Sequence, residues 1–333
     1  MYSLDLEVFA TLIAWLERGI PSWLCTVTAT WGSAPREVGS LMACNAEGQQ
    51  CGSLSGGCIE EDLLDRIRAG QIASDHAQHL IYGESPEEAE RLKLPCGGTL
   101  GVLLEPLTAA RDLAWLKTVQ QHIDKRECIL RTVDFRSGES VLKPGGSGGH
   151  FALSREGSEP LMLEQVYGPQ FHLFLVGVSE VSRALARFAL LMDYRVSVCD
   201  PRPEQIASWN VDHVQLLRAM PDEAVGRYAN DRRSAVLALT HDPRIDDMGL
   251  MEAFNTEAFY IGAMGSAATS RKRRLRLQQL DITEADLERL HAPIGLPIGS
   301  KTPAEIAIAI LAELTQVRAS MRQSREAPAA LCG

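Results

Sequence analysis

The stretch His172-Leu173-Phe174-Leu175-Val176 opens an alternation of strands and helices that decides the fold of this chain. Residues 182–192 follow with helical spacing, and residues 195–200 (RVSVCD) form a second apolar run. Strand, helix and strand in this order are typical of a βαβ unit with parallel strands. The stretch therefore predicts the start of a doubly wound α/β domain.

The same alternation continues toward the C-terminus. Apolar runs at 235–240 and 258–262 predict two further strands, and a helix is expected after Thr302. Thr302 is a suitable N-cap, Pro303 suits the first helical position, and Glu305 completes a capping box. These elements extend the prediction to a Rossmann-like parallel sheet.

The first half of the chain mixes helices with hairpins. Helices are predicted at 4–18, 59–64 and 109–125, and extended segments at 23–31, 41–44, 50–54, 99–104 and 128–135. A chain of 333 residues exceeds the size at which one core keeps growing. We therefore expect a mixed α+β domain at 1–167, a boundary near Gly168-Pro169, the Rossmann-like domain at 168–325 and a tail at 326–333.

Composition restricts the class of protein. The net charge of −10 argues against nucleic acid as a partner. No apolar run is long enough to span a bilayer, and the N-terminus lacks a basic secretory segment, so a cytoplasmic protein without a membrane partner is expected. All eight cysteines should then be reduced thiols, and their spacings give no paired Cys-x-x-Cys zinc pattern.

Two cysteines stand beside paired glycines. Gly56-Gly57-Cys58 leads into a helical run, where the helix dipole and unpaired N–H groups favour a thiolate, and Cys96-Gly97-Gly98 precedes a strand-like run. The glycines permit close approach, and their N–H groups suit anionic oxygens. The two motifs indicate one shared ligand, so we expect Cys58 and Cys96 to lie close together. The alternative is that both are buried core thiols.

The loop after the first parallel strand departs from a dinucleotide-binding sequence. Such a loop has the form Gly-x-Gly-x-x-Gly, but residues 177–182 read GVSEVS and keep only Gly177. Ser179 blocks close approach of a pyrophosphate, and Glu180 adds a negative charge. Asp200 stands where a ribose-binding acid is expected, with a strand-end turn as the alternative. NAD(P) binding is therefore doubtful.

Other candidates lie at strand ends and in loops. The segment Gly262-Ala263-Met264-Gly265-Ser266 lies between a strand and a helix, where open α/β sheets bind ligands, and Ser266 is a possible helix cap. His241 ends a buried strand and is better placed than His76 and His79, which are assigned to a polar loop. Arg36 can pair with a phosphate, or it is a solvated surface residue.

A basic run follows the same segment. Arg271-Lys272-Arg273-Arg274, with Arg276, is distributed over several faces of a predicted helix. We interpret it as a solvated charge run, with contact to a phosphate or an acidic partner as the alternative.

Several segments together carry a family resemblance. The chain resembles the XdhC/CoxI family of maturation factors for xanthine dehydrogenase, carbon monoxide dehydrogenase and related molybdenum hydroxylases. The resemblance spans nearly the whole chain and is carried by residues 31–36 (WGSAPR), 52–60 (GSLSGGCIE), 95–99 (PCGGT), 240–242 (THD), 260–266 (YIGAMGS) and 292–299 (APIGLPIG). The chain departs from the family at Ser179 and Ser182, where a glycine-rich loop is common, and at Pro297, where an acidic residue is frequent.

The resemblance implies a chaperone more than a catalyst. Such a protein binds molybdenum cofactor, either molybdopterin or its cytosine dinucleotide form. It supports cofactor sulfuration with a cysteine desulfurase and inserts the cofactor into an apo molybdenum hydroxylase. A cofactor-modifying cytidylyltransferase and a second copy in a homodimer are further expected partners. The expected cofactor-binding residues are Arg36, Gly56, Gly57, Cys58, Cys96, Gly97, Gly98, His241, Gly262, Gly265 and Ser266, in a cleft between the two domains.

Two other functions remain open from the sequence. An NAD(P)-dependent oxidoreductase is favoured by the topology of the second domain and opposed by the altered loop at Gly177. A thiol redox enzyme would use Cys58 and Cys96, although the chain has no Cys-x-x-Cys motif to support it.

Overall fold

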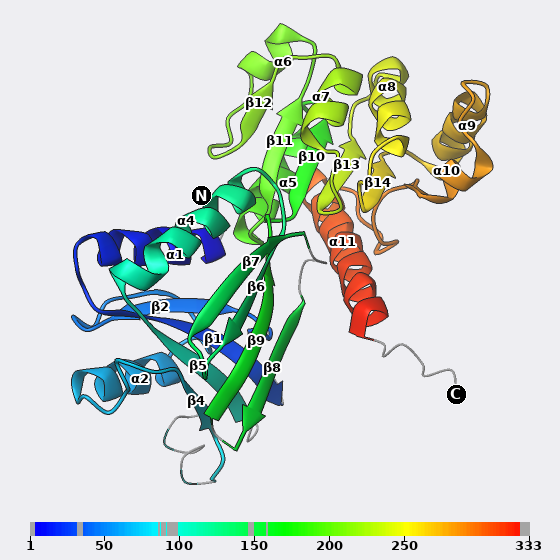
Figure 1. Ribbon diagram of the computed structural model, residues 1–333. Coiled ribbons are helices and arrows are strands. Elements are labelled where there is room, and N and C mark those ends of the chain that lie inside the picture. Colours follow the sequence, from blue (N-terminus) through cyan, green and yellow to red (C-terminus); the bar gives the residue numbers. More distant parts are fainter. Residues whose placement is uncertain are drawn as a thin grey trace, which may run out of the picture. The chain divides into compact units, whose positions relative to one another are not determined.

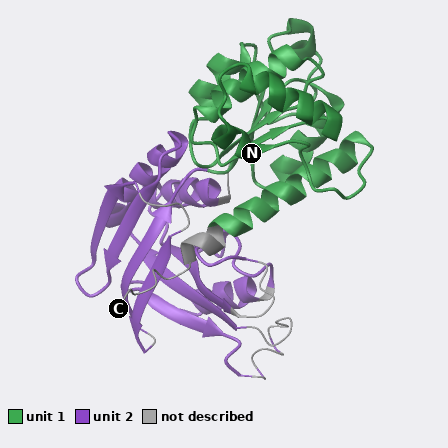
Figure 2. Ribbon diagram, turned by 90° about the vertical axis from the view of Figure 1, so that its right-hand side faces the viewer, with its two compact units in different colours: residues 1, 170–333 green, residues 2–169 purple. Residues whose placement is uncertain are grey.

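The computed structural model describes residues 4–31, 36–85, 87, 91, 99–145, 150–157 and 159–326. Its internal contacts divide the chain into two compact units, residues 2–169 and residues 170–333 (Figure 2). Each unit has its own sheets and its own hydrophobic core, so each is described by itself.

An antiparallel sheet forms the centre of the N-terminal unit (Figure 1). Its strands are β1 (Ser22–Trp31), β2 (Leu41–Asn45), β3 (Gln50–Gly52), β4 (Gln78–Tyr82) and β5 (Thr99–Leu107), in the order β3-β2-β1-β5-β4. Helix α2 (Cys58–Arg68) packs on one face, and α1 (Leu4–Glu17) with α4 (Ala109–Asp124) covers the other. Because both faces are buried, β2 has no exposed residue.

A second antiparallel sheet completes this unit. It contains β6 (Ile129–Asp134), β7 (Glu139–Pro144), β8 (Phe151–Glu156) and β9 (Glu159–Tyr167), in the order β7-β6-β9-β8. Leu103 of β5 packs against Val133 and Leu163, and the buried ion pair between Arg131 Nη2 and Glu105 Oε2, 2.9 Å long, joins the two sheets. The expected mixture of helices and hairpins is confirmed.

The C-terminal unit contains a parallel sheet of six strands. They are β10 (His172–Val176), β11 (Arg195–Cys199), β12 (Gln215–Leu217), β13 (Ser234–Ala238), β14 (Tyr260–Ala263) and β15 (Leu290–His291). Their order is β12-β11-β10-β13-β14-β15, and every pair is parallel. The strand order reverses between β10 and β13, as in a Rossmann fold. The predicted α/β doubly wound class is confirmed.

Helices cover both faces of the parallel sheet. Helices α5 (Glu180–Leu191) and α11 (Pro303–Glu326) bury their apolar residues on one face, and α7 (Pro221–Tyr228), α8 (Pro243–Phe254), α9 (Ala267–Gln278) and α10 (Glu284–Glu288) contribute to the core on the other. The short helix α6 (Pro203–Ala207) follows β11. The described chain contains no helix with the length and apolar composition needed to cross a bilayer.

Helix starts follow the predicted capping chemistry, with one shift. The backbone N–H of Thr302 donates to Glu305 (2.9 Å) and Thr302 Oγ1 accepts the N–H of Glu305 (3.3 Å), which confirms the capping box. Helix α5 begins at Glu180 and not at Ser182, because Ser179 is its N-cap and accepts the N–H of Ser182 at 3.1 Å.

Candidate functional site

The loop before α2 is organised around the carboxylate of Glu60. This side chain is 2% exposed and accepts six hydrogen bonds of 2.6–3.0 Å. The donors are the hydroxyls of Ser53 and Ser55 and the backbone N–H groups of Leu54, Ser55, Gly56 and Gly57. Burial favours the neutral acid, but these hydrogen bonds outweigh it and hold the pKa of Glu60 well below its usual range. The loop is therefore folded around an internal anion.

One part of the sequence interpretation is wrong at this loop. The N–H groups of Gly56 and Gly57, expected to face an anionic ligand, both donate to Glu60, at 3.0 and 2.9 Å. The two glycines are exposed, and a Cβ on either would have no neighbour within 4 Å among the described residues, so packing in this part of the chain does not require a glycine at either position. Gly56 has a φ of +99°, a conformation that favours glycine. A ligand can therefore approach the exposed surface of this loop, but the N–H groups of Gly56 and Gly57 are not free to bind it.

Strand register brings two motif segments to one end of the first sheet. Trp31, the last residue of β1, pairs with Thr99, the first residue of β5. The segment that follows β1 and the one that precedes β5 therefore start at the same end of the sheet. Strand β3 runs in the same direction as β1, because β2 is antiparallel to both, but Gly52 pairs with Met42 and so lies level with Cys25, in the middle of β1.

The predicted residues of these segments are only partly described. Arg36 is half-buried, and Cys58 is the first residue of α2. Cys96, Gly97 and Gly98 lie outside the described residues, so the expected proximity of Cys58 and Cys96 stays a prediction.

Two other cysteines are core residues. Cys25 and Cys44 are completely buried with their Sγ atoms 3.6 Å apart. Their hydrogen bond, together with burial, raises the pKa of Cys25. These thiols are therefore unsuited to nucleophilic or ligand chemistry.

The assignment of His79 to a polar loop is wrong. This residue lies in β4 with 6% exposure, because β4 pairs with β5 and is covered on one side. Arg155 Nη1 lies 3.0 Å from His79 Nδ1, and His79 Nε2 lies 2.7 Å from Thr28 Oγ1. Since a guanidinium only donates, Nδ1 must accept and the ring proton lies on Nε2. Burial, with the charge of Arg155, lowers the pKa of His79 to about 4.

The Gly177 loop is held by contacts within the C-terminal unit. The buried carboxylate of Asp200 accepts the N–H of Val178 at 2.9 Å and pairs with Arg202 at 2.8 Å. Ser179 and Ser182 cap each other at the start of α5. A Cβ on Gly177 would lie 2.0 Å from Cγ2 of Thr240, so this glycine is required by packing. The groups that hold a dinucleotide in other Rossmann folds are used internally here.

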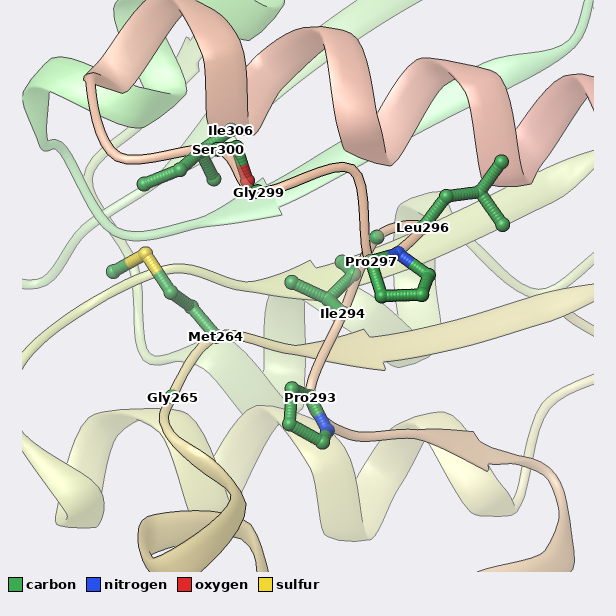
Figure 3. Close-up of a pocket in the computed structure, with 10 residues that line it drawn as sticks. Met264, Gly265, Pro293, Ile294, Leu296, Pro297, Gly299, Ser300 and Ile306 are labelled. Carbon is green, nitrogen blue, oxygen red and sulfur yellow. The ribbon is translucent and has the colours of Figure 1, made fainter.

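A cavity of about 590 Å³ lies at the carboxyl end of β14, beside the start of α11 (Figure 3). It is formed by the turn after β14, the segment after β15 and the first turn of α11. The lining residues are Met264, Gly265, Pro293, Ile294, Gly295, Leu296, Pro297, Gly299, Ser300 and Ile306. Its volume suits a small organic ligand, and its walls are mostly apolar.

The predicted residues of this unit occupy different positions around the cavity. Gly265 lines it, and Ser266 caps α9 by accepting the N–H of Thr269 at 3.1 Å, as expected. Gly262 is buried within β14, where a Cβ would lie 2.5 Å from Cδ1 of Ile294, so it permits the packing of a cavity wall. His241 is exposed beyond the end of β13 and does not line the cavity.

The interpretation of the basic run of α9 as solvated is wrong for three of its members. Arg273 is 3% exposed, pairs with Asp246 at 2.8 Å, and donates to the carbonyl oxygen of Met264 at 3.0 Å. Arg276 pairs with Asp247 at 2.8 Å, and Arg274 donates to two backbone carbonyls near α10. Arg271 and Lys272 are exposed, as expected. The run mainly attaches α9 to its neighbours.

Glu313 of α11 connects the cavity wall to the sheet. Its carboxylate accepts the hydroxyl of Tyr260 and the N–H of Gly295, both at 2.6 Å, and lies 2.7 Å from His291 Nδ1. The rings of Tyr260 and His291 are stacked with their centres 4.2 Å apart. Burial would raise the pKa of Glu313, but these contacts lower it. Sequence reasoning missed this cluster, because its members come from β14, β15 and α11 and have no local motif.

The described histidine, cysteine, aspartate and glutamate side chains include no group of three or more that could hold a metal ion. What the two units offer is a pair of ligand-accessible features: the exposed loop at Gly56-Gly57 and the cavity beside Met264. The chain is thus a two-domain protein: an antiparallel domain, which carries the loop Gly56-Gly57-Cys58 (the glycine–cysteine loop), is followed in sequence by a Rossmann-fold domain.

Comparisons with known proteins identify the family. The family described as the XdhC Rossmann domain matches residues 173–314, and the XdhC and CoxI family matches residues 15–83. The chain belongs to the XdhC and CoxI family. The resemblance inferred from its motifs is therefore confirmed.

Relatives match over nearly the full length. The chain is 27% identical to a probable xanthine dehydrogenase subunit of Bacillus subtilis (strain 168), covering 93% of this chain and 97% of that one. It is 25% identical to the molybdenum cofactor insertion chaperone PaoD of Escherichia coli (strain K12), covering 91% and 85%. A crystal structure described as a xanthine dehydrogenase from Bacillus halodurans is 27% identical and superposes with a TM-score of 0.73 over 98% of each chain.

Proposed function

We propose that this protein is a molybdenum cofactor insertion chaperone for an enzyme of the xanthine dehydrogenase type. It binds the cofactor, as molybdopterin or its cytosine dinucleotide form, supports its sulfuration, and transfers the cofactor to the apo-enzyme. A cysteine desulfurase supplies the sulfur, and a cytidylyltransferase acts on the cofactor before transfer. Two copies form a homodimer.

The observation that carries this proposal is the match to PaoD along 91% of the chain, which includes both units. A relative that shared only the Rossmann domain would support a fold and no more, since that fold hosts many activities. Here the match extends into the antiparallel domain as well, and the XdhC and CoxI family model covers the part of that domain that contains Gly56-Gly57-Cys58.

In the N-terminal unit, the proposed contacts lie in the three motif segments that follow β1, follow β3 and precede β5. Cys58 and Cys96 supply soft sulfur for the metal centre or carry sulfur during sulfuration. Gly56-Gly57 and Gly97-Gly98 let the cargo approach, and Arg36 pairs with an anionic oxygen of it. Since Glu60 already takes the N–H groups of Gly56 and Gly57, the anionic end of the cargo must be held elsewhere.

In the C-terminal unit, the segment from Gly262, at the end of β14, to Ser266 is proposed to contact the cargo. Gly265 lines the cavity, Gly262 makes room for its wall, and Ser266 fixes the start of α9. His241, exposed beyond β13, is proposed to contact the cargo from the loop after that strand.

The decisive experiment is metal and pterin analysis of the protein purified from a host grown with molybdate. We expect molybdenum and pterin in equal amounts with the wild type. The Cys58→Ser/Cys96→Ser double variant should retain less cofactor and activate an apo molybdenum hydroxylase poorly, with an unchanged thermal midpoint. Cys51→Ser is the matched control, because Cys51 is a partly exposed thiol of the neighbouring strand β3.

Two outcomes would contradict the proposal. Wild-type protein that carries neither molybdenum nor pterin, and does not activate the apo-enzyme when cofactor is supplied, is not an insertion chaperone. Full activation by the double variant would remove the thiols from the mechanism while leaving the chaperone function intact.

A further inference from the structure

The cavity beside Met264 has the walls of a site for a planar ring. Pro293 and Pro297 present apolar pyrrolidine rings, and Met264, Ile294 and Ile306 are apolar side chains around the same space (Figure 3). No arginine, lysine or histidine belongs to the described lining. The cavity thus favours an uncharged heterocycle over a phosphate in its interior, because burying an unpaired charge is costly.

The rim of the cavity at Gly265 has different chemistry. Ser270 of α9 is 3% exposed, and its hydroxyl has no hydrogen-bond partner among the described residues. This oxygen lies 3.9 Å from the position that a Cβ on Gly265 would occupy, so it stands beside the cavity-lining turn. An unpartnered buried hydroxyl is rare and costs free energy unless a ligand or water satisfies it.

The first turn of α9 adds donors at the same place. Ser266 Oγ takes the N–H of Thr269, but the N–H groups of Ala267 and Ala268 belong to the first turn and have no acceptor within the helix. The first turn of α9 contains no acidic residue, in contrast to those of α5 and α11, which contain Glu180 and Glu305. Donors without a nearby carboxylate favour an anion.

We propose that the cavity binds a phosphorylated planar heterocycle, with the ring between the apolar walls and the phosphate at the Gly265–Ser270 turn. This assignment rests on the proposed function for the identity of the ring, a pterin with a phosphorylated side chain. A nucleotide has the same ring-plus-phosphate chemistry. The Gly177 loop is less suited to the anion, because Asp200 and Ser182 accept the N–H groups of Val178 and Ser179, and Glu180 places a negative charge in the first turn of α5.

The test is a titration of the full-length protein with neopterin monophosphate, neopterin, cytidine monophosphate and inorganic phosphate, followed by pterin fluorescence and calorimetry. We expect the phosphorylated pterin to bind most tightly. Ser270→Ala should weaken its binding about tenfold and leave neopterin unchanged, since one hydrogen bond to a charged group is lost. Ser300→Trp should block both pterins by filling the cavity, and Ser320→Ala on the distant part of α11 is the matched control.

Four other results of these titrations would contradict the proposed ring site, phosphate site or ligand class. If phosphorylated pterin binds wild type and Ser270→Ala equally well, the phosphate does not bind at the first turn of α9. Undiminished binding to Ser300→Trp, or to Met264→Trp if the first variant does not fold, would place the ligand outside the cavity. If cytidine monophosphate binds more tightly than phosphorylated pterin, the ligand of the cavity is a nucleotide and not a pterin. If wild type binds none of the probes, the cavity is not a binding site for this class of ligand.

Cofactor content and pterin binding together distinguish a wrong cavity assignment from a wrong chaperone function. If molybdenum and pterin co-purify with Ser300→Trp as well as with wild type, the chaperone function stands and this cavity is not its site. If phosphorylated pterin binds the cavity but no cofactor is carried or inserted, the site stands and the chaperone function is wrong.

Discussion

Glu60 Oε2 accepts the backbone N–H of Gly57 at 2.9 Å, one turn before it in the chain. The same carboxylate also accepts the N–H of Gly56, so the negative charge of Glu60 occupies the position that an external anion takes at a helix N-terminus. Two consequences follow for the loop before Cys58. Its shape is fixed without a ligand, and the charge of Glu60 offsets the positive end of the α2 helix dipole.

Glu60→Gln should destabilise the N-terminal unit by about 3 kcal/mol, because a buried amide supplies one acceptor oxygen where six donors converge. The folded-state pKa of Glu60 is depressed, so its contribution is present above the unfolded pKa of about 4.5 and is lost only as pH falls below that value. Urea unfolding at pH 7 and pH 5 should therefore show the same deficit. Glu61→Gln, at an exposed neighbour, is the control, and equal stability of the two variants would refute the role of Glu60.

His79 should make the protein less stable in mild acid. Burial, with Arg155, lowers its pKa from 6.5 to about 4, so the unfolded state binds more protons than the native state between these values. Stability is then complete above about pH 6.5 and falls by about 2–3 kcal/mol as pH decreases toward 4. His79→Gln should flatten this part of the pH profile of urea unfolding. His76→Gln, at an exposed position, should leave the profile as in wild type, and a profile unchanged by His79→Gln would contradict the assignment.

Removing one partner of the Asp246–Arg273 ion pair should destabilise the protein more, relative to its contribution, than replacing both partners with apolar residues. Both side chains are buried, so Asp246→Leu or Arg273→Met alone leaves the other charge buried without this partner and should destabilise the protein by about 3–5 kcal/mol. The double variant Asp246→Leu/Arg273→Met should be destabilised by less than the sum of the singles. Arg271→Met is the exposed control. A double-mutant cycle by urea unfolding measures the coupling, and strict additivity would show that the ion pair does not act as a unit.

The fold could be predicted because its signals are local. The alternation that starts at His172 fixes the parallel sheet, and Thr302-Pro303 with Glu305 marks the start of α11 through chemistry confined to four residues. The family resemblance likewise rests on contiguous segments and is confirmed.

The site could be predicted only where it depends on such segments. His79 is misplaced by sequence reasoning because its burial comes from pairing with β5, more than twenty residues away, and Arg273 because its partner Asp246 lies on α8. At Gly56-Gly57 the motif itself is recognisable, but the acceptor of its N–H groups is inside the motif, at Glu60. Residue type indicates which contacts are possible, and tertiary pairing decides which of them form.

Gly262 should tolerate no larger residue without a change in the cavity wall. A Cβ there would lie 2.5 Å from Cδ1 of Ile294 and 2.6 Å from Cε1 of Tyr260, both closer than real contacts. Gly262→Ala should destabilise the protein by about 1–3 kcal/mol through overpacking, and the second substitution Ile294→Val should recover part of this loss by removing the clashing methyl. Thermal and urea unfolding of both variants provide the test. If Gly262→Ala is as stable as wild type, Ile294 and Tyr260 can shift to accommodate the added methyl group, and the packing at Gly262 is not tight.

NAD(P) should bind weakly, because the residue expected to hold its ribose is already engaged. Asp200 is completely buried, accepts the N–H of Val178 and pairs with Arg202, and these hydrogen bonds lower its pKa despite burial. A ribose would have to displace Arg202, and the pyrophosphate would meet Ser179 and the charge of Glu180. Calorimetric titration with NADH and NADPH at moderate salt should therefore give little heat, and Asp200→Ala should not improve it. Tight stoichiometric binding that Asp200→Ala abolishes would instead favour an oxidoreductase.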